Sequence, residues 1–219
     1  MRILAALVVV LLTLPAVAGE DVTFTTADGL KITGTLYPSG RKGAAGVVAL
    51  PMYMRQRSSW EPVAAHFTKA GIDFLAIDMR GHGDSAVQDG EDLSRRAKGR
   101  DPKLFNAMWQ DALAAREFLI GKGADENRIG LLGASVGCSV AIDAASRTEK
   151  IPGVCVMTPG KAYLGVNTME DLPGYGKRPM LILSSKEEAG GGATAIQEKL
   201  GDAAEIVLYD ERQVHGTLM

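Results

Sequence analysis

Hydrophobic positions along the chain follow two periods in turn. Short runs that are almost wholly apolar alternate with longer segments in which apolar residues recur every three or four positions. The first pattern is typical of strands buried on both faces of a sheet, and the second is typical of amphipathic helices. The predicted strands of this series are 46–50, 74–78, 128–132, 153–157, 179–183 and 205–209, and the predicted helices are 59–70, 104–120, 135–145 and 193–200. The alternation predicts an α/β fold, with a mostly parallel sheet and helices on both of its faces.

Two shorter β-rich runs, 22–26 and 31–37, precede this series. The turn 27–29 between them ends in glycine, which adopts positive φ readily, so the two runs are predicted to form an antiparallel hairpin. The polar and charged stretch 83–99 is predicted to be a loop that can carry a short helix.

The longest helical pattern, 104–120, has one apolar stripe and is predicted to be a single helix. Asp101 supplies an N-cap and Pro102 a first-turn proline near its start, and Gly121 and Gly123 lie where a C-terminal cap is expected.

The first eighteen residues have the pattern of a secretory signal peptide. Arg2 precedes the uncharged apolar run 3–14, and the small residues 16–18 provide a cleavage site. The apolar run is shorter than the ~20 residues that a membrane-spanning helix needs. We therefore expect cleavage before Gly19, a secreted or periplasmic location, a single domain over 19–219, and no stable membrane span after cleavage.

Composition and charge narrow the classes of partner. The 219 residues are 46% hydrophobic and 23% charged, close to the average for globular proteins. The formal net charge is -2 with both signs interspersed, which is not the basic footprint of a nucleic-acid-binding protein. Nucleic acid is therefore not expected as a partner. Cys138 and Cys155 lie in apolar stretches and are interpreted as buried thiols, with a disulfide as the alternative in an oxidising compartment.

A candidate nucleophile lies where a predicted strand passes into a predicted helix. Residues 133–137 read Gly-Ala-Ser-Val-Gly, which is Gly-x-Ser-x-Gly in a strand–turn–helix context. A serine on such a strained turn needs neighbours with almost no side chain, and the turn presents its Oγ above the carboxyl end of the sheet. We predict that Ser135 is the nucleophile; the alternative is a serine that only caps the helix.

Serine needs a general base, and His66, His82 and His215 are the available histidines. His215 follows the last predicted strand and is the predicted base. His82 follows a strand end directly and is expected to fix its loop by a hydrogen bond, and His66 is expected on the first helix as a surface or packing residue.

The base needs an orienting carboxylate, and the order serine, acid, histidine places it in the loop after the strand 179–183. That loop contains Glu187 and Glu188. The spacing from the strand end favours Glu188, with Glu187 as the alternative.

Acyl transfer also needs donors for the developing oxyanion, usually two backbone N–H groups. The N–H of Val136 is the first candidate. The N–H of Tyr53, in the loop after strand 46–50, is the second, because Pro51 has no N–H to donate.

Taken together, the segment 80–85 (Arg-Gly-His-Gly-Asp-Ser), the motif 133–137, the acidic loop and 215–217 (His-Gly-Thr) resemble the α/β-hydrolase superfamily, near its dienelactone-hydrolase-like and small serine esterase members. The resemblance covers nearly all of 21–219. It implies a mostly parallel eight-stranded sheet, a triad of Ser135, Glu188 and His215, and an oxyanion hole from the amides of Tyr53 and Val136. The chain departs from the family in its Pro51-Met52, where His-Gly is common, in its glutamate acid, and in the four residues after His215.

The 21 residues 158–178 are too few for the helical cap that many members of the superfamily insert there, so we expect no large cap domain and an open site. The resulting hypothesis is a serine hydrolase that cleaves small carboxylic esters through an acyl-enzyme at Ser135 and uses no cofactor. The alternatives are a peptidase or amidase of the same fold and a non-catalytic binding protein with that fold. The sequence leaves the oligomeric state open.

Overall fold

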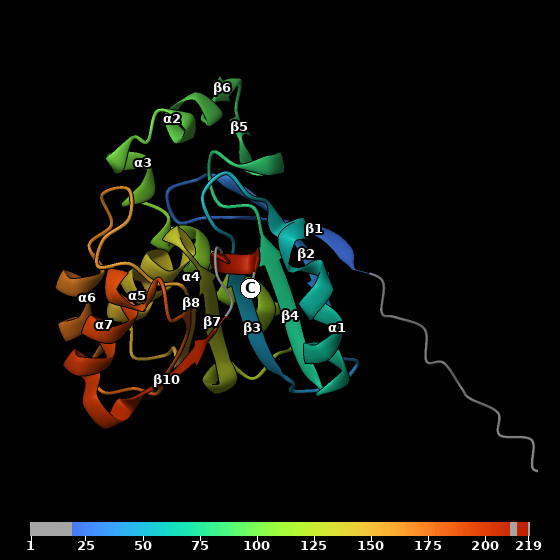
Figure 1. The fold of residues 1–219 in the computed structure, drawn as a ribbon. Coiled ribbons are helices and arrows are strands. Elements are labelled where there is room, and N and C mark those ends of the chain that lie inside the picture. The colour runs from blue at the N-terminus through green and yellow to red at the C-terminus, as the bar shows by residue number, and fades with distance from the viewer. Residues whose placement is uncertain (1–18, 211–213, 219) are drawn as a thin grey trace, which may run out of the picture.

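The computed structural model describes residues 19–210 and 214–218. The predicted signal peptide, residues 1–18, lies outside the described residues. Eight strands form one sheet in the order β1-β2-β4-β3-β7-β8-β9-β10 (Figure 1). The pairs β1–β2 and β2–β4 are antiparallel, and every later pair is parallel, so the predicted hairpin and mostly parallel sheet are confirmed. The strands of the sheet are β1 (Glu20–Thr25), β2 (Lys31–Tyr37), β3 (Ala45–Leu50), β4 (Ile72–Ile77), β7 (Ile129–Ala134), β8 (Val154–Met157), β9 (Met180–Ser185) and β10 (Ala204–Tyr209).

Helices cover both faces of the sheet, as predicted. Helix α1 packs on one face beside β4, and α4, α5 and α7 pack on the other. The α-helices are α1 (Glu61–Lys69), α2 (Ser94–Lys98), α3 (Pro102–Phe105), α4 (Trp109–Gly121), α5 (Val136–Ser146), α6 (Thr168–Tyr175) and α7 (Ala193–Leu200).

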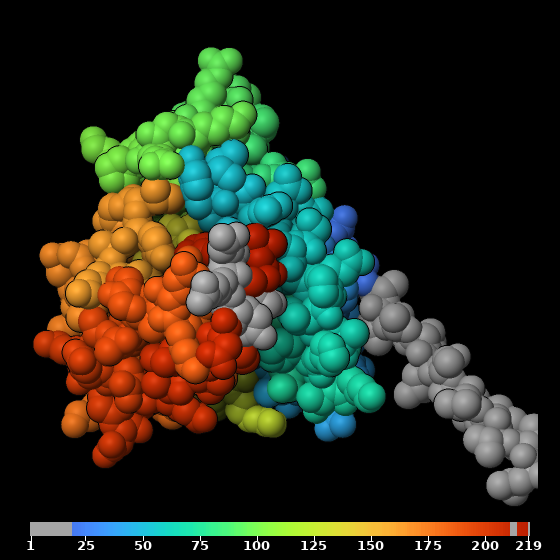
Figure 2. Space-filling view, viewed as in Figure 1, coloured from blue at the N-terminus to red at the C-terminus, as the bar shows by residue number. Residues whose placement is uncertain are grey.

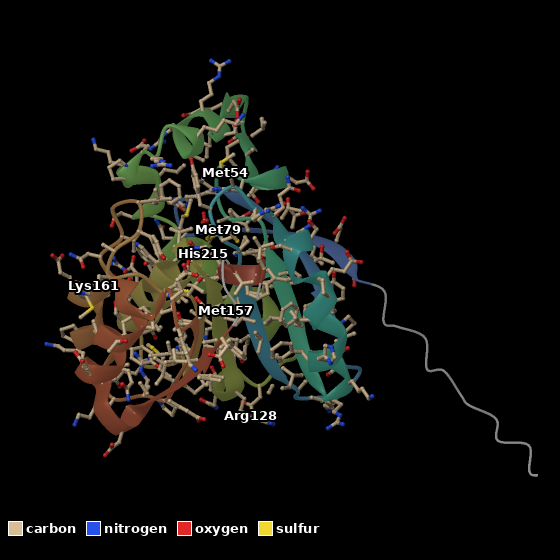
Figure 3. All side chains as sticks on the ribbon, in the orientation of Figure 1. Met54, Met79, Arg128, Met157, Lys161 and His215 are labelled. Carbon is tan, nitrogen blue, oxygen red and sulfur yellow. The ribbon has the colours of Figure 1, made fainter. Side chains whose placement is uncertain are left out.

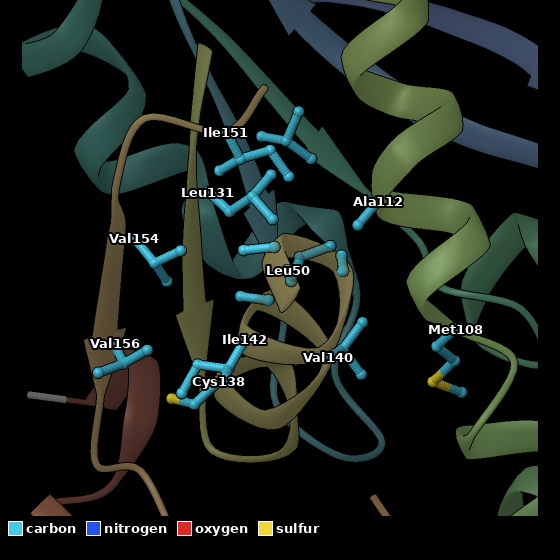
Figure 4. Close-up of a cluster of buried hydrophobic side chains, with 14 of the residues drawn as sticks. Leu50, Met108, Ala112, Leu131, Cys138, Val140, Ile142, Ile151, Val154 and Val156 are labelled. Carbon is cyan, nitrogen blue, oxygen red and sulfur yellow. The ribbon is translucent and has the colours of Figure 1, made fainter. Parts of the chain in front are cut away.

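The core is divided into two clusters by the sheet. The larger cluster fills the space between the strands and α4, α5, α6 and α7, and Figure 4 shows Cys138, Val140 and Ile142 of α5 within it. The smaller cluster lies under α1, where Trp60 and Ala64 meet strand residues of the opposite face. Because both faces bury apolar side chains, the strands read as continuous apolar runs in the sequence.

The predicted helix 104–120 is interrupted in the structure. Helix α3 ends at Phe105, and a turn separates it from α4. The Asn106 side chain in this turn donates to the carbonyls of Pro102 (2.8 Å) and Gly165 (2.9 Å). An asparagine side chain that bonds locally to the backbone competes with helix continuation, which accounts for the break. Asp101 caps α3 as predicted, accepting from the N–H of Lys103.

The segment 83–105 projects beyond the carboxyl ends of the strands, and Figure 2 shows it in green at the top of the molecule. The predicted loop 83–99 within it contains α2 and a small hairpin of β5 (Val87–Gln88) and β6 (Glu91–Asp92). The segment 83–105 is short, and no large cap domain is present among the described residues. In the same part of the chain, no helix is long and apolar enough to cross a membrane.

A cluster of buried ion pairs fixes the chain where the segment 83–105 begins. Arg80, three residues after the end of β4, is paired with Asp111 of α4 and Asp28 of the β1–β2 turn. Asp111 is fully buried and accepts bonds from both the backbone N–H and the Nε of Arg80, each at 2.8 Å. The guanidinium therefore fixes the loop 81–83 against α4.

We expect Asp111→Ala to lower the free energy of unfolding by about 3–5 kcal/mol, because it leaves the buried guanidinium of Arg80 with its main partner removed. The matched control is Asp202→Ala, an exposed aspartate, with an expected change within about 0.5 kcal/mol. Urea unfolding followed by circular dichroism measures both, and equal midpoints for the two variants would contradict the expectation.

Candidate active site

Ser135 lies on a strained turn between β7 and α5. Its φ of 53° and ψ of -119° are a conformation that costs a non-glycine residue about 1–3 kcal/mol. The turn is held by a hydrogen bond from the Ser135 N–H to the carbonyl of Met157 (3.0 Å).

The two glycines of the motif are required by close backbone approach. A Cβ on Gly133 would lie 2.3 Å from the carbonyl oxygen of Gly137, and a Cβ on Gly137 would lie 2.3 Å from that of Leu50. The Gly-x-Ser-x-Gly spacing therefore follows from the tightness of the turn.

His215 and Glu188 form a direct pair at the same edge of the sheet. The Nδ1 of His215 lies 2.6 Å from Oε2 of Glu188. Both side chains are partly exposed, at 29% and 39%. When Nδ1 carries the imidazole proton and donates it to the carboxylate, Nε2 is left with a lone pair that can accept a proton. Of the two candidate acids, Glu188 is the one whose carboxylate meets the histidine.

The two amides predicted to form the oxyanion hole follow β3 and Ser135. Neither the N–H of Tyr53 nor that of Val136 donates to another residue within 19–210 and 214–218. The Tyr53 side chain turns away from the sheet edge, and its hydroxyl donates to the carbonyls of Ala97 and Lys98. These contacts fix the loop that carries the Tyr53 amide.

The other two histidines are placed elsewhere. His82 is 4% exposed, and its Nδ1 lies 3.2 Å from the carbonyl oxygen of Arg80, in agreement with a loop-fixing role. Burial lowers the pKa of His82, which keeps the ring neutral near pH 7. His66 is exposed on α1.

Tyr163 is a residue of the site that sequence reasoning missed. It lies in the segment between β8 and α6, its ring meets that of His215 edge-on at 6.4 Å, and its hydroxyl donates to the carbonyl of Thr158 at 3.3 Å. No direct hydrogen bond joins Ser135 to His215 among the described residues, where the Nδ1 of His215 is paired with Glu188. Figure 3 shows His215 near the upper ends of the central strands, with Met157 below it.

Both cysteines are free thiols. Cys138 belongs to the core cluster under α5, whereas Cys155 packs against the cluster on the opposite face of the sheet. Burial raises the pKa of Cys138 well above its usual value and that of Cys155 to about 12, so neither is a thiolate near neutral pH. Within the described ranges, no cluster of three or more His, Cys, Asp or Glu side chains is arranged to hold a metal ion.

Comparison with known proteins relates this chain to two curated relatives, two solved structures and one family model. The chain is 28% identical over 200 residues to the thiohydrolase ApmlB of Arthrinium phaeospermum, covering 90% of this chain and 61% of the relative. It is 30% identical over 146 residues to the polyketide transferase ATR5 of Stachybotrys chlorohalonatus, covering 66% of this chain and 46% of the relative. The chain thus spans about half to three fifths of the length of these relatives. Among solved structures, dienelactone hydrolase from Anabaena variabilis superposes with a TM-score of 0.69 at 19% identity, covering 92% of this chain and 88% of that one.

An esterase of Pyrococcus furiosus superposes with a TM-score of 0.68, also at 19% identity, covering 89% of this chain and 81% of the esterase. At such low identity these two structures establish the fold alone, which is that of the α/β hydrolases. The family model for serine aminopeptidases, S33, matches residues 44–168, more than half of the chain. The strained serine turn lies inside this matched region. The chain therefore belongs to the serine aminopeptidase S33 family of the α/β-hydrolase superfamily.

Proposed function

We propose that the protein is a serine hydrolase that cleaves small carboxylic esters through an acyl-enzyme at Ser135. The observation that carries the proposal is the pair of Glu188 and His215, at 2.6 Å, on the same sheet edge as a serine held in a strained turn. A strained serine and an oriented histidine are the two parts that nucleophilic catalysis by serine requires.

In the proposed reaction, His215 Nε2 takes the proton of Ser135 Oγ as the oxygen attacks the ester carbonyl carbon. Glu188 accepts from Nδ1, holds the ring in the required tautomer and stabilises the imidazolium. The carbonyl oxygen becomes negative and receives hydrogen bonds from the N–H groups of Tyr53 and Val136. His215 then gives the proton to the leaving alcohol, and water repeats the sequence to release the acid.

Small acyl groups are proposed because Met52, in the loop after β3, brings an apolar side chain against the loop that carries His215. Met52 packs on the loop that carries His215: a Cβ on Gly216 would lie 3.0 Å from the Met52 sulfur. The hydroxyl of Thr217 lies 3.7 Å from the same sulfur. An apolar side chain at this position favours a short acyl group.

Thioesters are a second candidate substrate. The observation that favours them is the thiohydrolase among the relatives, whose match covers 90% of this chain. A thioester would pass through the same acyl-enzyme, with a thiol in place of the alcohol as leaving group.

The experiment that tests the proposal treats the purified protein with a fluorophosphonate probe and locates the adduct by mass spectrometry. We expect a single adduct on Ser135 and none on heat-denatured protein. Hydrolysis is then measured with acetyl, butyryl and palmitoyl esters of 4-nitrophenol, and with the acetyl thioester of matched leaving-group pKa. We expect kcat/KM to be highest for the two short esters; no adduct on folded protein, or a maximum on palmitate, would contradict the proposal.

A further inference from the structure

Thr158, the residue directly after β8, has a backbone conformation that is rare for its type. Its φ is 53°, in the left-handed region, where a β-branched residue such as threonine is a clear outlier. Glycine adopts this conformation without strain, because it has no Cβ. Backbone strain persists only where the surrounding contacts hold it, and it gathers at functional sites. The contacts of Thr158 show what holds it.

Every polar group of Thr158 has a partner. Its N–H donates to the carbonyl of Leu183 in β9 at 2.7 Å, and its carbonyl accepts from the hydroxyl of Tyr163 at 3.3 Å. Its hydroxyl donates to the carbonyl of Met157 at 2.7 Å and accepts from the N–H of Gly216 at 2.8 Å. The residue is 2% exposed, so these bonds are shielded from water.

The hydroxyl of Thr158 joins the serine turn to the histidine loop. The carbonyl of Met157 accepts from this hydroxyl and, at 3.0 Å, from the N–H of Ser135. Gly216, whose N–H donates to the hydroxyl, is the residue after His215. Three hydrogen bonds in a row therefore connect the backbone of the nucleophile to the backbone beside the base. A hydroxyl has one proton, and Thr158 gives it to the Met157 carbonyl, so a lone pair is left for Gly216.

The other contacts of the histidine loop fix different features of it. The bond to Glu188 acts on Nδ1 of His215 and sets the tautomer. It does not set the distance from Nε2 to the serine, because the partly exposed glutamate side chain has three torsion angles and can follow the ring. The Met52 sulfur, 3.7 Å from the hydroxyl of Thr217, is a weak acceptor. The bond to Thr158 acts on the backbone from which the imidazole extends.

Gly216 itself lies close to the serine turn. Its φ is 56°, and a Cβ on it would lie 3.4 Å from the Cβ of Ala134, the residue before Ser135. The backbone of the histidine loop therefore rests on the serine turn, and the hydrogen bond to Thr158 holds it there.

We propose that Thr158 is a positioning residue, whose hydroxyl ties the backbone after His215 to the turn of Ser135 and keeps the imidazole within reach of the nucleophile's proton. The inference rests on the proposed function. Thr158 acts through the Gly216 backbone and takes no part in bond making. Its effect is large because a misplacement of about 1 Å between reacting groups can cost about 100-fold in rate.

The test compares Thr158→Val with Thr158→Ser. Valine keeps the β-branched shape of threonine, removes the hydroxyl and leaves the Gly216 N–H without its acceptor. Serine keeps the hydroxyl and removes only the methyl group. For Thr158→Val we expect kcat for 4-nitrophenyl acetate to fall about 10- to 100-fold, with KM within about twofold of the wild type. The rate of fluorophosphonate labelling is expected to fall by the same factor, because labelling uses the same nucleophile and base. For Thr158→Ser we expect both rates to stay within about threefold.

Thr26→Val is the matched control. Thr26 is buried in the turn between β1 and β2, and its hydroxyl accepts from the N–H of Leu30 at 2.9 Å. The strands β4 and β3 separate β2 from β7, which leads to the serine turn. Both valine variants leave a buried N–H without its acceptor, so we expect both to lower Tm. Only Thr158→Val is expected to lower kcat.

Thr158→Gly keeps the test decisive if the valine variant does not fold. It removes the hydroxyl together with the backbone strain, so it loses less stability than a variant that keeps the strain. We expect its kcat to fall at least as far as that of Thr158→Val, and circular dichroism to show a folded protein.

Labelling of the wild type at Ser135, together with wild-type kcat in Thr158→Val or Thr158→Gly, would overturn the positioning role and leave the proposed function intact. The role would also be overturned by a loss in Thr158→Val that Thr158→Ser shares fully, or by an equal loss of kcat in Thr26→Val. Absence of labelling in the folded wild type would overturn both proposals.

Discussion

Replacing Ser135 by alanine is expected to lower kcat for ester hydrolysis by about 10⁴-fold or more, and replacing His215 by alanine is expected to have a similar effect. The reason is that the two side chains form one reacting unit: the serine oxygen is a weak nucleophile while it keeps its proton, and the imidazole has no other proton to remove. The double variant is therefore expected to be no slower than the slower single variant.

The measurement is single-turnover kinetics with 4-nitrophenyl acetate, together with fluorophosphonate labelling. Ser58→Ala and His66→Ala are matched controls, since Ser58 and His66 are exposed near and on α1 and are placed outside the site. Retention of more than 1% of wild-type kcat by Ser135→Ala would show that the nucleophile has been assigned to the wrong residue. Additive losses in the double variant would contradict the shared reaction step.

Glu188→Gln is expected to lower kcat by about 10³-fold, with little change in KM. The amide no longer offers a negative charge to the imidazolium that forms on His215. It can also present its NH₂ group to Nδ1, which favours the tautomer in which Nε2 carries the proton and cannot act as a base.

Glu187→Gln is the matched control, one position earlier in the same loop, and we expect it to keep kcat within threefold. Steady-state kinetics at saturating ester separates the two variants. A collapse of kcat in Glu187→Gln and not in Glu188→Gln would move the acid to the neighbouring residue and show that the loop changes conformation during turnover.

Much of the fold could be predicted because its signals are local. Each buried strand is a short apolar run, and the turn at Ser135 is defined by glycines whose Cβ atoms would collide with backbone. The spacing from the end of β9 favoured Glu188 over Glu187, and the structure pairs Glu188 with His215. These inferences needed only the order of elements along the chain.

What was missed depends on contacts between distant segments or on breakers inside an element. The break between α3 and α4 follows from a bond between Asn106 and Gly165, 59 positions away. Helix α6 contains Pro173, which argues against a helix when the sequence is considered alone. Tyr163 has no motif around it, and its place beside His215 follows from the turn at 163–166 and from the space at Gly160.

The segment after β8 joins the loops of the site to one another. The hydroxyl of Thr158 accepts from the N–H of Gly216, next to His215, at 2.8 Å. Residues 160 and 192 form an isolated bridge, and Lys161 donates to the carbonyl of Gly191, close to Glu188. Loops connected in this way open together, as one cooperative unit with a single free energy of local unfolding, and not one at a time. The site would then lose His215 and Glu188 in the same event. Forms in which Ser135 is in place without its histidine or its acid would therefore be rarely populated.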